Sequence, residues 1–209
     1  MNRPAVTAAR IAAGDDRTRY DPVAMSLHWL TVALVLTLFF LSQFWDFADR
    51  PTKHLMIVAH MSFGIVLAAV VIARLIWRLI PGHQRPAAVS GWVELASKGV
   101  HWLLYAFLAA QAVLGFVLRW SGDEAMSFFG LLITPPFAPF PKTAHEFVGE
   151  LHRWVGWMII VIAAGHAGAA LFHQFVLHDD VLWRMLPGHF ARRQQALAPS
   201  PEEAAERRR

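Results

Sequence analysis

Four long apolar runs constrain the fold of this chain more than any other feature of its sequence. They span about residues 26–45, 55–77, 100–120 and 150–177, and a helix needs about 20 mostly apolar residues to cross a bilayer. The core helices of a soluble bundle would be shorter and would each carry a polar face, which these runs lack. The sequence therefore predicts an all-α protein, a four-helix transmembrane bundle.

The composition agrees with a membrane protein and excludes several other classes. Charged residues make up 16% of the chain, against about 25% in soluble domains. The absence of cysteine excludes disulfides, cysteine-bound zinc, iron–sulfur clusters and thioether-linked haem. The net charge of +4 does not indicate nucleic-acid binding, because the basic residues lie between and beyond the apolar runs. Tryptophans typical of an aromatic belt lie near the run ends: Trp29, Trp45, Trp77, Trp102, Trp120 and Trp154.

The distribution of Lys and Arg predicts the orientation of the bundle. Most of these residues lie in the N-terminal arm, the second loop and the C-terminal tail. The positive-inside rule therefore places both termini in the cytoplasm. The residues concerned are Arg3, Arg10, Arg17, Arg19, Arg74, Arg78, Arg85, Lys98, Arg184, Arg192 and Arg193.

The same patterns predict how the chain is divided. Residues 1–19 lack the apolar region of a cleavable signal peptide, so we expect a cytoplasmic N-terminal arm there. Residues 20–188 are expected to form the transmembrane domain. Residues 189–209 have the composition of a disordered cytoplasmic tail. The loop at 121–142 is rich in Pro, Phe and Gly, and we expect it to be ordered against the bilayer surface.

Histidines inside the apolar runs are the main functional signal. An ionisable residue within a membrane helix is costly and marks a functional site by default. A single such histidine is more often a hydrogen-bonded contact between helices, but six in four helices are hard to explain in that way. The six are His28, His60, His101, His152, His166 and His173.

The spacing of these histidines predicts two sites at two depths. His152 and His166 are fourteen residues apart, close to four turns, so they face the same way about 21 Å apart along the axis. His60 matches the outer level of His152, whereas His28 and His101 both start helices at the inner level of His166. Two pairs of axial imidazoles suit two b-type haems, held between the helices of a bundle. Zinc or non-haem iron would instead require three or four ligands at one level.

Two glycines lie one turn after proposed ligands. Gly64 follows His60 and Gly156 follows His152. Without a side chain at these positions, a flat macrocycle can lie close to the helix. Close helix packing explains such glycines equally well in membrane proteins.

Several motifs resemble those of the bacterial cytochrome b561 family of inner-membrane di-haem cytochromes. They include Arg19-Tyr20-Asp21-Pro22, Ser26-Leu27-His28-Trp29-Leu30, Ala59-His60-Met61-Ser62-Phe63-Gly64, Arg74-Leu75-Ile76-Trp77-Arg78 and Gly165-His166-Ala167-Gly168. The resemblance covers roughly residues 19–188, and the Ser-x-His-Trp start also occurs in cytochrome subunits of nickel–iron hydrogenases. It implies a multi-pass protein of the bacterial inner membrane. The residues that match the family's haem ligands are His28, His60, His152 and His166.

The resemblance also implies an activity, which is superoxide oxidation at the outer face and reduction of ubiquinone. Outer cations would steer the superoxide anion: Arg50, Lys53, Arg119, Lys142 and Arg153. Arg119 and Arg153 would equally well snorkel or neutralise haem propionates. We assign Arg153 and Arg78 to the haem sites.

Quinone reduction consumes protons, so its site needs a titratable donor near a haem. His173 lies two turns beyond His166, and His101 and Lys98 lie near the same level. These three residues are the candidates for the quinone site. The remaining histidines are expected to be solvated in loops or in the tail: His54, His83, His145, His178 and His189.

Two other functions compete with this hypothesis. In the first, the chain serves as the membrane anchor and electron conduit of a separate dehydrogenase or hydrogenase and has no catalytic activity of its own. A haem-free transport protein is the weaker alternative, because no broken helix or buried carboxylate suggests a substrate path.

Overall fold

The computed structural model describes residues 21–80, 91–177, 182 and 185. The predicted N-terminal arm and C-terminal tail lie outside these residues, as do His83, His178 and His189. Most of the basic residues that predict the orientation also lie outside them.

Four long helices make up the described structure, and each is long and apolar enough to cross a membrane. The predicted all-α, four-helix transmembrane fold is therefore confirmed. The helices are α2 (Pro22–Phe44), α3 (Arg50–Leu79), α4 (Trp92–Ser121) and α5 (Lys142–Phe172). A 3₁₀ turn, η1 (Trp45–Phe47), follows α2, and a π-helical turn, η2 (His173–Leu177), follows α5.

The start of α2 shows how local chemistry fixes a helix end. The carboxylate of Asp21 accepts a hydrogen bond from the Ala24 N–H at 2.9 Å, and Pro22 occupies the first helical position. Asp21 Oδ1 also accepts a bond from the Trp77 indole N–H at 3.1 Å. Asp21 thus caps α2 and ties it to the last turn of α3.

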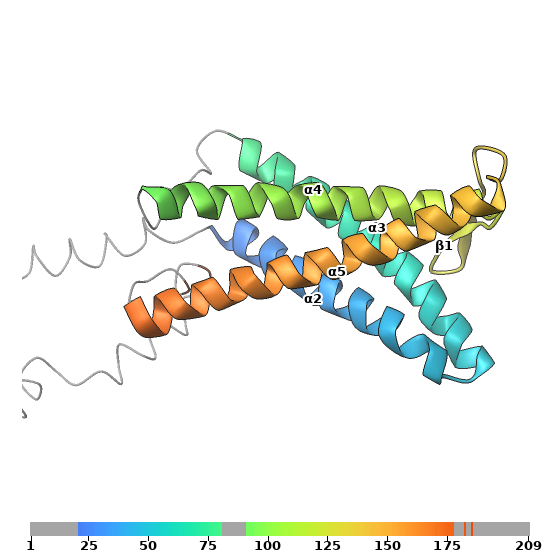
Figure 1. Ribbon diagram of the computed structural model, residues 1–209, viewed down its shortest axis with the longest axis horizontal. Helices are drawn as coiled ribbons and strands as arrows, with labels where there is room; N and C mark the ends of the chain where they lie inside the picture. Colours follow the sequence, from blue (N-terminus) through green and yellow to red (C-terminus); the bar gives the residue numbers. More distant parts are fainter. Residues whose placement is uncertain (1–20, 81–90, 178–181, 183–184, 186–209) are drawn as a thin grey trace, which may run out of the picture.

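The helices associate as two antiparallel pairs, α2 with α3 and α4 with α5, and α3 also packs against α4 (Figure 1). We call the end with the start of α2 and the end of α3 the His28 end. The opposite end, where α3 and α5 begin, is the His60 end. The buried core between the helices is small and apolar: Leu34, Leu67, Val70, Val71, Tyr105, Leu108 and Ile159.

Large apolar side chains also cover the outside of the helices. Phe40 on α2, Val113 on α4 and Val161 on α5 are 53%, 62% and 61% exposed. Such a surface is unfavourable in water but suits the hydrocarbon of a bilayer.

The loop between α4 and α5 contains a short antiparallel hairpin, β1 (Met126–Phe128) and β2 (Leu131–Ile133). β1 packs against α3, and the contact of this loop with the bilayer surface stays a prediction. The fully buried hydroxyl of Ser62 on α3 accepts a bond from the Phe129 N–H at 2.8 Å. The sequence pattern did not predict this hairpin.

Candidate functional site

One histidine pair lies at the His28 end of the bundle. The rings of His28 on α2 and His166 on α5 have their centroids 6.4 Å apart. His101 on α4 also faces His166, at a centroid distance of 5.0 Å. The structure therefore brings together the three histidines that sequence reasoning had placed at this level.

A second pair lies towards the His60 end. The rings of His60 on α3 and His152 on α5 have their centroids 6.5 Å apart. Nδ1 of His60 lies 3.0 Å from the carbonyl oxygen of Leu38, to which its N–H donates. This bond fixes the ring orientation and leaves Nε2 available as a ligand.

The ring distances can be compared with the requirement of a metal bound between two imidazoles. Two metal–nitrogen bonds of about 2.0–2.1 Å, plus about 1.1 Å from each nitrogen to its ring centroid, give about 6.3 Å between centroids. The His28–His166 and His60–His152 distances of 6.4 and 6.5 Å fit this value. The His101–His166 distance of 5.0 Å is too short. Within the described residues, no three histidine or acidic side chains converge to form a larger metal site.

Two arginines on α3 surround the histidines of the His28 end. Nη2 of Arg74 lies 3.3 Å from Nδ1 of His28, and the guanidinium carbon of Arg74 lies 5.3 Å from the ring centroid of Tyr105. Arg78 stacks on Trp102 at 5.4 Å. In the described part of the chain, neither arginine forms an ion pair with a carboxylate.

Two guanidinium groups with no carboxylate partner among the described residues make this end suited to an anionic group such as a haem propionate. Arg78 was a predicted site residue, but Arg74 was missed. Its spacing of four residues from Arg78, which puts both on one face of α3, was the signal available in the sequence.

Around His152, α4 and α5 fit together through two reciprocal contacts. Nε2 of Gln111 on α4 lies 3.2 Å from Nε2 of His152 on α5. A Cβ at Gly115 would lie 3.4 Å from His152 Cε1, and a Cβ at Gly156 would lie 3.2 Å from Gln111 Nε2. Each polar side chain therefore packs against a glycine of the other helix. Gly156 thus serves helix packing, whereas Gly64 has no side chain or neighbouring backbone within 4 Å of a Cβ.

The quinone-site candidates occupy different surroundings at the His28 end. Lys98 is exposed and forms an ion pair with Glu94 at 2.6 Å. Nδ1 of His101 lies 2.6 Å from the carbonyl oxygen of Ser97. His173 lies where α5 passes into the π-helical turn η2, next to the ring of Phe172.

The prediction that His54 and His145 lie in solvated loops was wrong, because polar turns extend α3 and α5 beyond their apolar runs. Both residues are in helices. His54 is exposed, whereas His145 is half-buried and its Nδ1 lies 2.9 Å from Ser121 Oγ. The Ser121 hydroxyl donates to the Leu118 carbonyl, so it accepts the bond from His145.

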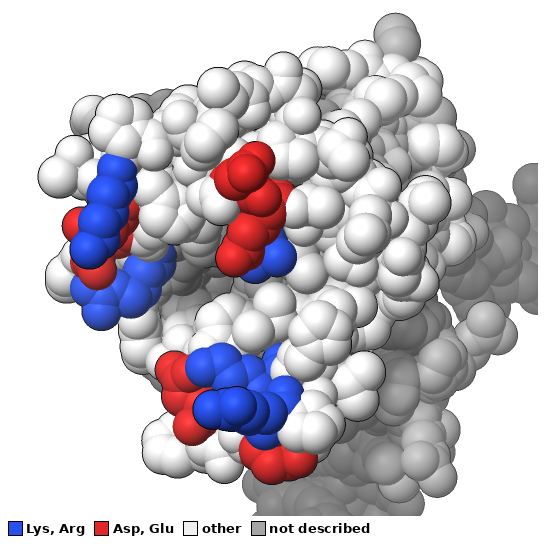
Figure 2. All heavy atoms as spheres, turned by 90° about the vertical axis from the view of Figure 1, so that its right-hand side faces the viewer, with Lys and Arg blue, Asp and Glu red and all other residues white. Residues whose placement is uncertain are grey.

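The predicted steering cations lie at the His60 end, but carboxylates accompany them. Figure 2 shows blue and red side chains side by side on this face. Ion pairs join Lys53 to Asp46, Arg119 to Glu124, Lys142 to Glu146 and Arg153 to Glu150. Among the described residues, segments 45–54 and 119–153 hold five Lys or Arg and six Asp or Glu. This end is therefore close to electrically neutral and not strongly basic.

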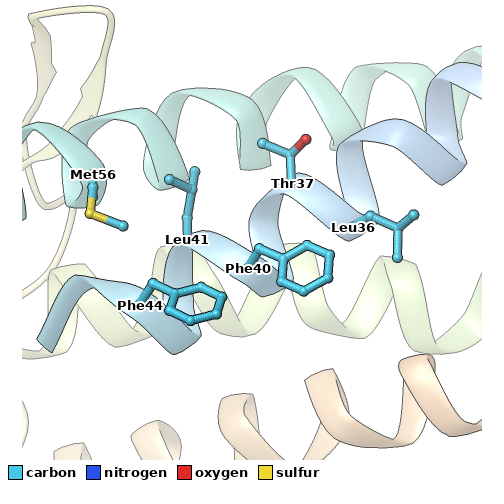
Figure 3. A pocket seen from close by; sticks show the side chains of 6 residues that line it. All are labelled: Leu36, Thr37, Phe40, Leu41, Phe44 and Met56. Atoms are coloured by element: carbon cyan, nitrogen blue, oxygen red, sulfur yellow. The ribbon is translucent and has the colours of Figure 1, made fainter. Parts of the chain in front are cut away.

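The pocket in Figure 3 has a volume of about 380 Å³ and does not belong to the histidine site. Five of its six lining residues are on α2, between Leu36 and Phe44, and the sixth is Met56. At 100° per residue, the α2 residues point on average about 150° away from His28. The pocket is therefore a groove on the face of α2 opposite the histidines.

A helical membrane protein with histidines paired at two depths belongs in the class of membrane-bound b-type cytochromes. Residues 19–188 match the prokaryotic cytochrome b561 family. The chain is a member of that family.

The sequences of individual relatives are similar to this chain over most of their length. Cytochrome b561 homolog 2 of Escherichia coli K12 is 29% identical over 80% of this chain and 91% of its own. Cytochrome b561 homolog 1 of the same organism is 28% identical, over 81% and 97%. The probable superoxide oxidase CybB of Yersinia pestis is 27% identical, over 81% and 96%.

Membership of the family establishes the general function. The chain is a multi-pass bacterial membrane protein that binds b-type haem and takes part in electron transfer. The resemblance inferred from the sequence motifs is thereby confirmed.

Proposed function

We propose that the chain binds two b-type haems, one between His28 and His166 and the other between His60 and His152. The two ring distances of 6.4 and 6.5 Å carry this proposal. A b-type haem held by each histidine pair would supply one-electron redox chemistry at that level, and two such levels would allow the chain to pass electrons across the membrane.

The surrounding residues orient the ligands and balance charge. The Leu38 carbonyl holds the ring of His60. Arg74 supplies positive charge beside His28, and Arg78 supplies it beside Trp102 and Tyr105. Arg153 is exposed and paired with Glu150, so its predicted role at a propionate would require that ion pair to open. We therefore favour Arg74 and Arg78 as the propionate partners.

We further propose that the His28 end faces the cytoplasm and that the membrane is the bacterial inner membrane, following the distribution of Lys and Arg. The domain limits remain those predicted: an arm at 1–19, the cytochrome domain at 20–188 and a tail at 189–209. In this orientation, electrons enter at the periplasmic His60 end.

The proposed reaction is superoxide oxidation at the His60 end and ubiquinone reduction. It is supported by the similarity to the relative from Y. pestis that is described as a probable superoxide oxidase. Quinone would take its protons near His173, His101 or Lys98. If a His173→Phe variant kept both haems and reduced quinone at the wild-type rate across pH 6–8, His173 would have no part in that site.

Paired substitutions test the ligand assignment. His28→Ala and His166→Ala should each remove the same haem, and His60→Ala and His152→Ala should each remove the other, as judged from optical difference spectra and redox titration. His101→Ala is the matched control and should retain both haems. Loss of one haem in His101→Ala, with both retained in His28→Ala, would overturn the assignment.

A further inference from the structure

Gln111 is the polar side chain of α4 that reaches the ring of His152. Its Nε2 atom lies 3.2 Å from Nε2 of His152, and Gly156 provides the space that it occupies. Two buried atoms of this contact, Gln111 Oε1 and His152 Nδ1, have no hydrogen-bond partner among the residues that the structure describes. Both orphaned atoms call for an explanation, because a buried polar group without a partner is costly.

A change in the orientation of the Gln111 amide explains the unpaired ring nitrogen. A 180° rotation of the Gln111 amide exchanges its nitrogen and oxygen, which have nearly the same shape. Oε1 then accepts the N–H of His152 Nε2, and the neutral ring keeps its lone pair on Nδ1. The amide nitrogen of Gln111 takes the position that Oε1 had occupied. A metal-bound imidazole needs this state, with one nitrogen free for the metal and the other donating its proton to an acceptor.

We infer that Gln111 is a positioning residue, which holds the ring of His152 and makes it a stronger electron donor to the haem iron. The inference rests on the proposed ligation by His152. The contact joins α4 to α5, so it places α4 in the site although α4 supplies none of the proposed ligands. The absence of a side chain at Gly115, where a Cβ would lie 3.4 Å from His152 Cε1, leaves room for the ring against α4.

Such a hydrogen bond has a predictable effect on the redox potential. An acceptor on the distant nitrogen increases the electron donation of the imidazole, which stabilises the oxidised iron and lowers the potential. A Gln111→Leu variant should therefore raise the potential of the haem held by His152. A Gln111→Glu variant, which places a carboxylate acceptor of the same size there, should lower it.

The experiment is a spectroelectrochemical titration of the purified holoprotein and its variants, in which the two haems are resolved. The haem between His28 and His166 is the internal control, and its potential should not change. Gln43→Leu is the matched control, because Gln43 is an exposed glutamine on α2. It should leave both potentials unchanged.

Opposite shifts of one haem in the two Gln111 variants would establish the positioning role. Unchanged potentials, shifts of the same sign, or equal shifts of both haems would overturn it. If Gln111→Leu fails to assemble, the sign of the shift in Gln111→Glu decides. A His152→Ala variant that keeps both haems would instead show that the proposed ligation itself is wrong.

Discussion

At the scale of single residues, a ligand histidine depends on the group that holds its second ring nitrogen. His60 is held by a backbone carbonyl, that of Leu38, which every sequence supplies and no substitution removes. His152 instead has the side chain of Gln111 beside its Nε2 atom, and a substitution can change that side chain. The two histidines of this proposed ligand pair thus have partners of different kinds, and we expect a substitution at Gln111 to change the electron donation of His152.

Gly64 gives a prediction at this scale. A Cβ at this position would have no side chain and no backbone of another segment within 4 Å, so a side chain there begins in open space. If a haem bound by His60 lies over this glycine, Gly64→Leu should lower the haem content selectively at that site. The measurement is the haem-to-protein ratio together with the difference spectrum. Gly99, which is equally open, is the matched control, and Gly99→Leu should keep both haems. Equal haem content in the two variants would show that no macrocycle lies over Gly64.

At the scale of secondary structure, the helices could be predicted from the sequence but the hairpin could not. Apolar runs of sufficient length leave a chain in a bilayer few alternatives to a helix, because every backbone polar group must be satisfied internally. The hairpin depends on a contact between Ser62 and Phe129, which are 67 residues apart. No local pattern in residues 121–142 indicates that partner.

The histidine site likewise combines features that follow from spacing along one helix with features that follow from packing between helices. Helical periodicity was sufficient to predict the two levels of histidines, because His152 and His166 share one helix. The choice between His28 and His101 depends on how α2 and α4 pack against α5. The contact between Gln111 and His152 likewise depends on packing between helices. Distances across helices are a tertiary property, which spacing along one helix does not determine.

At the scale of secondary structure, we predict that Ser62 anchors the hairpin to α3. Ser62→Ala would leave the Phe129 N–H without its acceptor and should destabilise the hairpin by about 1–3 kcal/mol. Limited proteolysis of the protein in detergent should then cleave residues 125–141 faster than in the wild type. Ser42→Ala is the control, since the Ser42 hydroxyl bonds only to nearby groups on α2. Equal cleavage rates in the two variants would mean that Ser62 does not anchor the hairpin.

At the scale of the whole molecule, the two ends differ in how charge is arranged. At the His60 end, most cations are paired with carboxylates, so the field beyond the Debye length of about 8–10 Å is weak. At the His28 end, Arg74 and Arg78 have no carboxylate partner among the described residues. Long-range attraction of an anionic donor is therefore smaller than the number of Lys and Arg residues alone would indicate.

A variant in which glutamine replaces Arg50, Lys53 and Lys142 tests whether these cations attract superoxide to the His60 end. The variant would carry an excess of carboxylates at the His60 end, so it should repel superoxide. Haem reduction should slow roughly a few-fold at low ionic strength and recover as salt is added. Stopped-flow absorbance measures both effects. A rate and a salt dependence equal to those of the wild type would show that these residues do not guide the donor, and would favour a separate protein as the electron source.

The central claim is that the chain holds two b-type haems, each between two histidines, at two depths of one four-helix bundle. A pyridine haemochrome assay of the purified protein, combined with its low-temperature electron paramagnetic resonance spectrum, tests it most directly. We predict two non-covalent b haems per chain, both low-spin, as two axial imidazoles require. One haem per chain, no haem, or a high-spin signal from either site in the intact protein would contradict the account.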